Sequence, residues 1–197
     1  MTSCHRETDL PEPGYDYANS YLPLKTGNTW TYIHNKNVQD TVITKVEGDS
    51  FSQGFQAFYT VVNSGEGGMY YSQEGDLYYT IVYTDLGPGF ISPILDASAY
   101  EGYSVTTKDS IAYSNDPTPR LSTMTILGTN ISKTINGKTY KNVIHTSVDV
   151  EEAFNGYYMN IQTYDFYFSP GIGLIEIDKS NAGYIYDILT IVSYKVD

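Results

Sequence analysis

Few side chains in this sequence have the type and spacing that covalent or acid–base chemistry requires. The cysteine and histidine content is limited to Cys4, His5, His34 and His145. The histidines lack metal-ligand spacing, and a nucleophile on the terminal segment that carries Cys4 could not be held against a base. Adjacent carboxylates such as Glu151-Glu152 would point to opposite faces of a strand. We therefore expect no enzymatic activity, no metal site and no cofactor.

Cys4 fits a different chemistry, which is the attachment of lipid. Bacterial lipoprotein signals end in an aliphatic residue, two small residues and a cysteine that becomes the first residue of the mature protein. Thr2 and Ser3 fit the two small positions, and Met1 stands in the aliphatic one. We therefore expect lipid attachment at Cys4, with an incidental free thiol as the alternative.

Residues 1–20 are predicted to hold the remnant of this signal and a flexible tether. The stretch after Cys4 carries Pro11, Pro13 and Gly14 and few apolar side chains. A flexible coil of this length spans roughly 20–25 Å, and anchoring by more than one acyl chain is stable. The expected location is the cell envelope of a Gram-negative bacterium, anchored to the outer membrane on its periplasmic or its exposed side.

The charge balance argues against several partners. The chain has 11 Lys and Arg against 23 Asp and Glu, which gives a formal net charge of −12. Nucleic acids and anionic lipids repel such a protein. We therefore expect no nucleic-acid partner, and membrane contact through the lipid anchor only. An apolar run of about 18 residues is absent, so no membrane-spanning helix is expected.

The composition favours an all-β fold for a single domain over residues 21–197. Tyrosine occurs 21 times, and Tyr, Thr, Val and Ile favour strands with partly buried faces. Successive strands separated by turn signals predict one antiparallel meander of about ten strands. So many strands must hide their edges, which predicts a strongly curled sheet, as a half-barrel or a sandwich. A closed calycin-like barrel is the alternative.

Alternating residues and turn signals place the strands. Asn136-Gly137 and Asn155-Gly156 match the preferred residues of two-residue hairpin turns, and Trp30 on the first strand is expected to anchor the core. The expected strands cover residues 28–34, 40–46, 55–62, 69–73, 77–84, 121–135, 138–152, 157–168, 174–178 and 184–195.

Residues 85–102 interrupt this pattern with prolines and glycines and show no alternation. We expect an irregular segment here, with a short helix near 94–100 and a weak hairpin over 103–114. Long irregular segments often carry function, so this one is expected to form the wall of a ligand pocket or, alternatively, to plug an open end of the sheet. The expected ligand-binding residues are Tyr79, Tyr83, Phe90, Tyr100 and Tyr103.

Three stretches together resemble a family of secreted bacterial lipoproteins. They are residues 22–32 (LPLKTGNTWTY), 126–145 (ILGTNISKTINGKTYKNVIH) and 164–178 (YDFYFSPGIGLIEID). In that family a first strand carries Pro-Leu, Gly, Trp and Tyr, and a late aromatic strand runs into Pro-Gly-Val-Gly-Leu-Val. The resemblance implies a β-rich envelope domain with its lipid on Cys4, and it transfers no catalytic residue.

The sequence thus predicts a non-enzymatic envelope lipoprotein with a binding or scaffolding role. The alternative is a protein that binds a glycan or another small molecule in a pocket lined by tyrosines, because sugar rings stack on aromatic faces. A peptide is a further candidate ligand.

Overall fold

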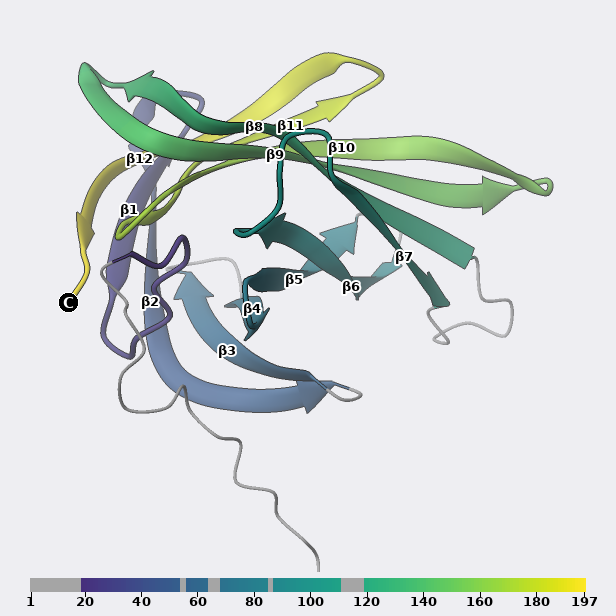
Figure 1. The fold of residues 1–197 in the computed structure, drawn as a ribbon, viewed down its shortest axis with the longest axis horizontal. Coiled ribbons are helices and arrows are strands. Elements are labelled where there is room, and N and C mark those ends of the chain that lie inside the picture. Colours follow the sequence, from purple (N-terminus) through teal and green to yellow (C-terminus); the bar gives the residue numbers. More distant parts are fainter. Residues whose placement is uncertain (1–18, 54–55, 64–67, 85–86, 111–118) are drawn as a thin grey trace, which may run out of the picture.

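A computed structural model describes residues 19–53, 56–63, 68–84, 87–110 and 119–197, and the side chains within 19–47, 70–81, 91–108 and 119–197. This part of the chain folds into twelve strands and has no helix, so it holds no helix able to cross a membrane (Figure 1). The strands are β1 (Thr29–His34), β2 (Asn37–Gln53), β3 (Gln56–Asn63), β4 (Gly68–Glu74), β5 (Leu77–Thr84), β6 (Gly87–Asp96), β7 (Ser104–Ser110), β8 (Pro119–Ile135), β9 (Lys138–Phe154), β10 (Tyr157–Ser169), β11 (Gly173–Asn181) and β12 (Tyr184–Lys195).

All twelve strands belong to one sheet with the order β6-β5-β4-β3-β2-β1-β12-β11-β10-β9-β8-β7. The first and last strands pair near its centre, where Trp30 lies opposite Tyr194. From β1 the chain runs outward to the edge strand β6, crosses to the other edge at β7, and returns strand by strand to β12. The predicted all-β antiparallel meander is confirmed, with twelve strands in place of about ten.

Two-residue turns join the strands of the long hairpins. Asn136-Gly137 has φ values of 49° and 80°, and Asn155-Gly156 has φ values of 51° and 83°. Hairpin turns of this type need positive φ at both positions, which Asn and Gly adopt at low cost. The turns that the sequence predicted at these two pairs are therefore confirmed.

The sheet curls until its two edges approach, but it does not close. β6 lies across β8 and β9, where the Thr146 hydroxyl donates to the Ile94 carbonyl at 2.7 Å. The hydroxyls of Ser92 and Ser122 lie 2.5 Å apart. In a closed barrel, backbone hydrogen bonds would join the two edge strands of the sheet. Here side-chain hydrogen bonds connect β6 to β8 and β9 instead, and β6 and β7 remain the edges of the sheet. The strongly curled sheet is confirmed, and the alternative of a closed calycin-like barrel is wrong.

The face turned toward the inside of the curl carries the hydrophobic core. Trp30 and Tyr32 from β1, Ile126 from β8 and Phe168 from β10 are buried there. The predicted role of Trp30 as a core anchor is confirmed. This face is called the inner face below, and the face that carries His145 is called the outer face.

Residues 85–102 are not the irregular segment that the sequence predicted. Most of the segment is the edge strand β6, whose Ile91 pairs with Ile81 and whose Pro93 pairs with Tyr79. Proline is tolerated here because an edge strand needs ladder bonds on one side only, and because the register shifts beside Pro93. The prolines and glycines therefore mark an edge strand and not a loop.

Two smaller predictions in this region are also wrong. The helix expected over 94–100 does not form, because Ile94 and Leu95 are fully buried within β6. The hairpin expected over 103–114 is not formed about Lys108-Asp109, since residues 104–110 are one strand paired with β8. Residues 111–118 lie outside the described residues.

The first and last of the three recognised sequence stretches meet in space. The indole Nε1–H of Trp30 donates to the Ile172 carbonyl at 2.5 Å, and the Tyr32 hydroxyl donates to the Leu174 carbonyl at 2.9 Å. The amide of Gly171 donates to the Ser20 carbonyl at 2.9 Å, and Ser20 is already buried. The residues of these two stretches therefore join the start of the domain to the β10–β11 turn. Residues 1–18 of the predicted tether lie outside the described residues.

The end of the β8–β9 hairpin folds over the outer face of the strands next to it (Figure 1). Lys133 forms an ion pair with Glu176 on β11, the Asn136 amide donates to the Ile191 carbonyl at 3.4 Å, and Lys138 donates to the Tyr194 hydroxyl at 3.0 Å. As a result, part of the outer face is also covered.

Candidate functional site

The residues that the sequence proposed for ligand binding are spread over three segments. Tyr79 is half-buried on β5, while Tyr100 and Tyr103 lie on the turn that leads to β7 with their ring centroids 6.1 Å apart. Tyr83 on β5 and Phe90 on β6 have side chains outside the described part of the chain. A pocket formed by these five residues stays a prediction. The segment that was expected to form its wall is strand β6.

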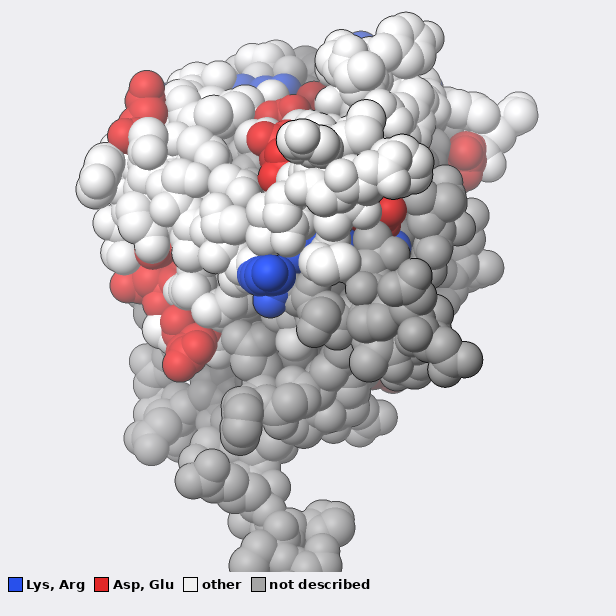
Figure 2. Space-filling model, turned by 90° about the vertical axis from the view of Figure 1, so that its right-hand side faces the viewer, with Lys and Arg blue, Asp and Glu red and all other residues white. Residues whose placement is uncertain are grey.

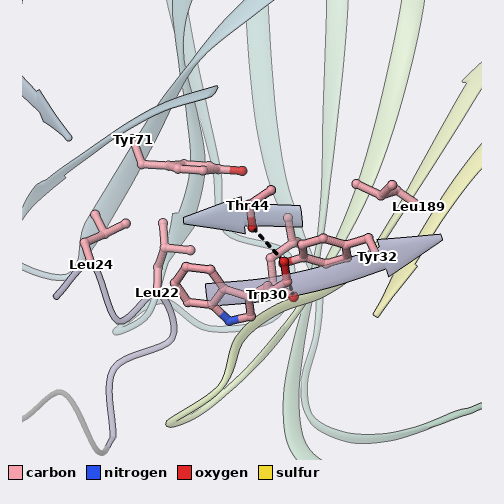
Figure 3. A pocket seen from close by; sticks show the side chains of 8 residues that line it. Leu22, Leu24, Trp30, Tyr32, Thr44, Tyr71 and Leu189 are labelled. Atoms are coloured by element: carbon pink, nitrogen blue, oxygen red, sulfur yellow. Dashed lines mark hydrogen bonds between the residues drawn. The ribbon is translucent and has the colours of Figure 1, made fainter. Parts of the chain in front are cut away.

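A cavity of about 20 Å³ lies in the core beside Trp30 (Figure 3). A space of this size holds one or two water molecules, whereas ligand sites are usually about 300–1,000 Å³. The cavity is lined by Leu22, Leu24, Trp30, Tyr32, Thr44, Tyr71, Leu174 and Leu189. Its polar groups face the protein, since the Thr44 hydroxyl donates to the Trp30 carbonyl at 3.4 Å and Tyr32 bonds to Leu174. This cavity is therefore a packing defect of the core and not a candidate site.

Charged side chains meet on the inner face where β1, β11 and β12 end. Asp187 Oδ1 lies 3.1 Å from His34 Nδ1, and Asp187 Oδ2 accepts from Lys179 Nζ at 2.9 Å. Burial alone would raise the pKa of Asp187, but the hydrogen bonds from Lys179 and His34 hold that pKa below its ordinary value. At neutral pH the site therefore presents an ionised carboxylate that two neighbouring donors fix in place.

Gln162 on β10 forms hydrogen bonds to β11 and to β12, at residues next to Lys179 and Asp187 in the chain. Its Oε1 accepts from the Tyr186 hydroxyl of β12 at 2.5 Å, and its Nε2 donates to the Ser180 carbonyl of β11 at 2.9 Å. Both ends of the amide are thus used, which fixes the Tyr186 ring across β11. A fixed aromatic ring beside polar groups is a common arrangement in ligand recognition.

The strand register decides which other side chains share this face. Gln162 pairs with Val150 and Tyr164 pairs with Val148, and both valines belong to the core. The register of β10 shifts between Asn160 and Gln162, so the alternation of faces is offset by one residue there. Met159 and Tyr157 consequently lie on the inner face, and Tyr158 lies on the outer face.

A similar shift occurs in β11 and β12, between Lys179 and Ser180. Lys179 lies opposite Tyr164, which places it on the inner face. By alternation Asn181 shares that face, and so does its partner Tyr184. The resulting surface is called the inner shelf below. It consists of His34, Tyr157, Met159, Gln162, Tyr164, Lys179, Tyr184, Tyr186 and Asp187.

The inner shelf is open to solvent at three of its four tyrosines. Tyr184 is 75% exposed and Tyr157 is 77% exposed. The hairpin end of β9 and β10 points to the right in Figure 1, toward the side that Figure 2 shows face on. Uncharged residues cover most of the described part of that side, and acidic and basic residues form several small patches among them. Tyr157 and Tyr184 stand within two stretches, residues 153–164 and 180–186, that include no charged residue in a chain of net charge −12.

The outer face has a separate polar cluster beneath the folded β8–β9 hairpin. His145 Nε2 lies 2.8 Å from Asp165 Oδ1, and the His145 ring stacks on Tyr167 with centroids 4.2 Å apart. Lys133 lies 3.5 Å above the centre of the Tyr167 ring. Burial, followed by the charge of Glu176, raises the pKa of Asp178 on this face, and Lys133 opposes that rise.

This outer cluster has the residue types of a metal or acid–base site but a different arrangement. Within the described ranges, no group of three or more His, Cys, Asp or Glu side chains could hold a metal ion. Lys133, Tyr167 and His145 are engaged with one another and with neighbouring carboxylates. The cluster therefore serves to hold the folded hairpin against the sheet.

The sequence did not indicate the inner shelf. His34 and Asp187 are far apart in the chain, and alternation alone places Tyr184 and Tyr186 on one face with Ile188. The shifts in β10 and in the β11–β12 pairing change that alternation. Two features of the sequence could have indicated this surface. They are the uncharged residues 153–164 around the Asn155-Gly156 turn and the uncharged turn at residues 180–186.

The comparisons with known proteins add little to this description. No protein-family model matches the chain, and no curated protein matches it. The crystal structure of a "putative lipoprotein" from Parabacteroides distasonis aligns with 90% of this chain and 99% of its own, at 10% sequence identity and a TM-score of 0.42. At this TM-score the likeness carries no argument about fold or function.

Proposed function

We propose that this protein is a non-enzymatic lipoprotein of the Gram-negative cell envelope whose β domain binds a glycan on the inner shelf. The observation that carries the binding role is the inner shelf itself, where exposed tyrosines stand beside a fixed carboxylate and a fixed amide. The sequence suggested a tyrosine-lined site at residues 85–102. We propose that the site lies instead at the ends of β10, β11 and β12.

The lipoprotein part of the proposal is supported by the sequence Thr2-Ser3-Cys4. Two small residues before a cysteine fit a lipid-attachment signal, and the proline-containing segment that follows fits a tether to the outer membrane. The precursor is expected to carry acyl chains on Cys4 and to fractionate with membranes. Acyl labelling and fractionation of Cys4→Ala test this, and unchanged labelling would contradict it.

The residue types of the inner shelf suit a sugar. Sugar rings stack their C–H groups on aromatic faces, which Tyr157, Tyr184 and Tyr186 provide. Sugar hydroxyls donate to carboxylates and accept from ammonium and imidazole N–H groups, and Asp187, Lys179 and His34 provide these partners. Because the carboxylate is already held by two neighbours, it loses little freedom when a ligand arrives.

The same contacts favour binding over catalysis. A general acid needs a pKa raised toward the working pH, whereas the hydrogen bonds from Lys179 and His34 lower the pKa of Asp187. The carboxylate with a raised pKa, Asp178, lies on the outer face under the folded hairpin. The two carboxylates are therefore on opposite faces of the sheet and would not act on one bond.

A glycan array followed by titration calorimetry tests the site with two matched substitutions. Tyr184→Ala removes an inner-shelf ring that is 75% exposed, and Tyr100→Ala removes a ring that is 73% exposed on the β6–β7 turn. The loss of one aromatic contact is expected to weaken binding by about 3- to 10-fold, for Tyr184→Ala only. If Tyr100→Ala alone weakened binding, the site would lie at the 85–102 segment, and if no glycan bound, the proposal would be wrong.

A further inference from the structure

We infer that the ligand of the inner shelf is an extended and uncharged glycan chain that lies along β10 from Tyr164 to the hairpin end at Tyr157. This inference rests on the proposed function and narrows it to a class of ligand. A single sugar would need only the group around Asp187 and Tyr186. The shelf continues well beyond that group.

The length of the shelf follows from the geometry of β10. Tyr164, Gln162, Met159 and Tyr157 follow one another on the inner face, with the register shift between the second and the third. Because of that shift, the partner strand β9 covers the same stretch in six residue steps, from Val148 to Phe154, which corresponds to about 20 Å at about 3.3 Å per residue. That distance is several times the width of one sugar ring.

Exposure rises steadily along the same row. Phe168 and Phe166 are buried in the core, Tyr164 and Gln162 are half-buried, and Met159 and Tyr157 are mostly exposed. Phe154 lies directly opposite Tyr157 across the turn and is also exposed. The inner-face side chains of β10 therefore continue beyond the hydrophobic core as a solvent-exposed surface rich in aromatic residues.

The absence of free charge along the shelf selects a neutral ligand. Residues 153–164 and 180–186 include no Asp, Glu, Lys or Arg, although the whole chain has a net charge of −12. Glu152, which pairs with Met159, is held by Arg120, and Lys179 is held by Asp187. An acidic glycan would find no uncompensated cation among these residues and would be repelled by the net charge.

The shelf is also fixed before a ligand arrives. Gln162 connects β10 to Tyr186 on β12 and to Ser180 on β11. On the outer side of the same strand, the Asn160 amide donates to Asp149 at 3.0 Å, and the Thr163 hydroxyl donates to Asp149 at 2.6 Å. A surface held on both sides suits a long ligand, because fewer side chains must be ordered on binding.

Affinity for neutral oligosaccharides of increasing length tests the inference. The probes are the purified cello-, xylo-, manno- and malto-oligosaccharide series from the disaccharide to the hexasaccharide, titrated by calorimetry into the intact chain. The test substitution is Tyr157→Ala, and the matched control is Tyr158→Ala, its neighbour on the outer face. Both are made at the same hairpin end, so a general disturbance of the hairpin would affect both.

We expect affinity for at least one series to rise with chain length. Tyr157→Ala should lower the affinity for the longest chain by about 3- to 10-fold and leave that for the disaccharide unchanged, whereas Tyr158→Ala should change neither. Affinity that does not depend on length, or equal effects of the two substitutions, would overturn the inference while leaving glycan binding intact. Binding of charged glycans only, or a dimer whose formation Tyr157→Ala abolishes, would also overturn it. Failure of every glycan to bind would overturn the proposed function as well.

Discussion

Replacement of Gly173 by alanine should reveal how tightly the β10–β11 turn is packed against the first strand. Gly173 has a φ of +101°, and a Cβ at this position would lie 3.2 Å from Pro23 Cδ and 3.4 Å from Trp30 Nε1. Trp30 is buried and bonded to the Ile172 carbonyl, so its ring cannot move away easily. The substitution therefore combines backbone strain with crowding.

The two contributions can be separated with Gly156→Ala. Gly156 has a φ of +83°, and a Cβ there would meet no atom of the described residues within 4 Å. The strain of an L-residue at positive φ costs about 1–2 kcal/mol at either position. Overpacking in a core adds about 1–3 kcal/mol, at Gly173 only. We therefore expect a loss of unfolding free energy of about 2–5 kcal/mol for Gly173→Ala and about 1–2 kcal/mol for Gly156→Ala.

Urea unfolding of the two variants and the parent chain measures this difference. Trp30 is the single tryptophan of the chain, so its fluorescence reports directly on the junction that Gly173→Ala disturbs. The m-value should stay the same, because a stability change without a change in compactness shifts only the midpoint. Equal losses for the two variants would refute the argument that Pro23 and Trp30 close tightly over Gly173.

Three further predictions concern buried or half-buried polar groups. The Thr190 hydroxyl is buried and has no hydrogen-bond partner among the described residues. Thr190→Val should therefore raise the free energy of unfolding by about 1 kcal/mol, and a loss measured by urea unfolding would contradict this. Asp187→Asn should destabilise the chain near pH 7 and should still do so near pH 4. The effect should fade only as the pH falls further, through the lowered pKa of Asp187. Asp178→Asn should have the opposite effect and raise the free energy of unfolding near pH 7, because the pKa of Asp178 is raised. This gain should vanish below about pH 4. Urea unfolding of both aspartate variants at several pH values tests the argument, which would be contradicted if the two variants behaved alike.

The lipid anchor and the family resemblance remain sequence-based predictions. Cys4 lies outside the described residues, and no family model matches the chain. The structure nevertheless gives a physical reason for the recognised residue types. Trp30, Tyr32 and Gly173 belong to one junction between the first strand and the β10–β11 turn. Their presence is explained by packing and does not require a shared function.

The elements that depend on local physics could be predicted from the sequence alone. Asn136-Gly137 and Asn155-Gly156 specified their turns because few other residue pairs adopt positive φ twice at low cost. Alternating tyrosine and β-branched residues specified strands, and the large indole of Trp30 specified a core position. The segment 85–102 was misread because prolines and glycines have the same local signature in a loop and in an edge strand.

Only the tertiary structure decided where the candidate site lies. A one-residue shift in β10 moves Tyr157 and Met159 to the inner face, and such a shift leaves no clear mark in the sequence. The cluster of His34, Lys179 and Asp187 comes from three strands that become neighbours only because β1 and β12 pair at the centre of the sheet. Sequence periodicity describes one strand at a time, whereas a binding surface is made by the register between strands, and that register is set by long-range packing.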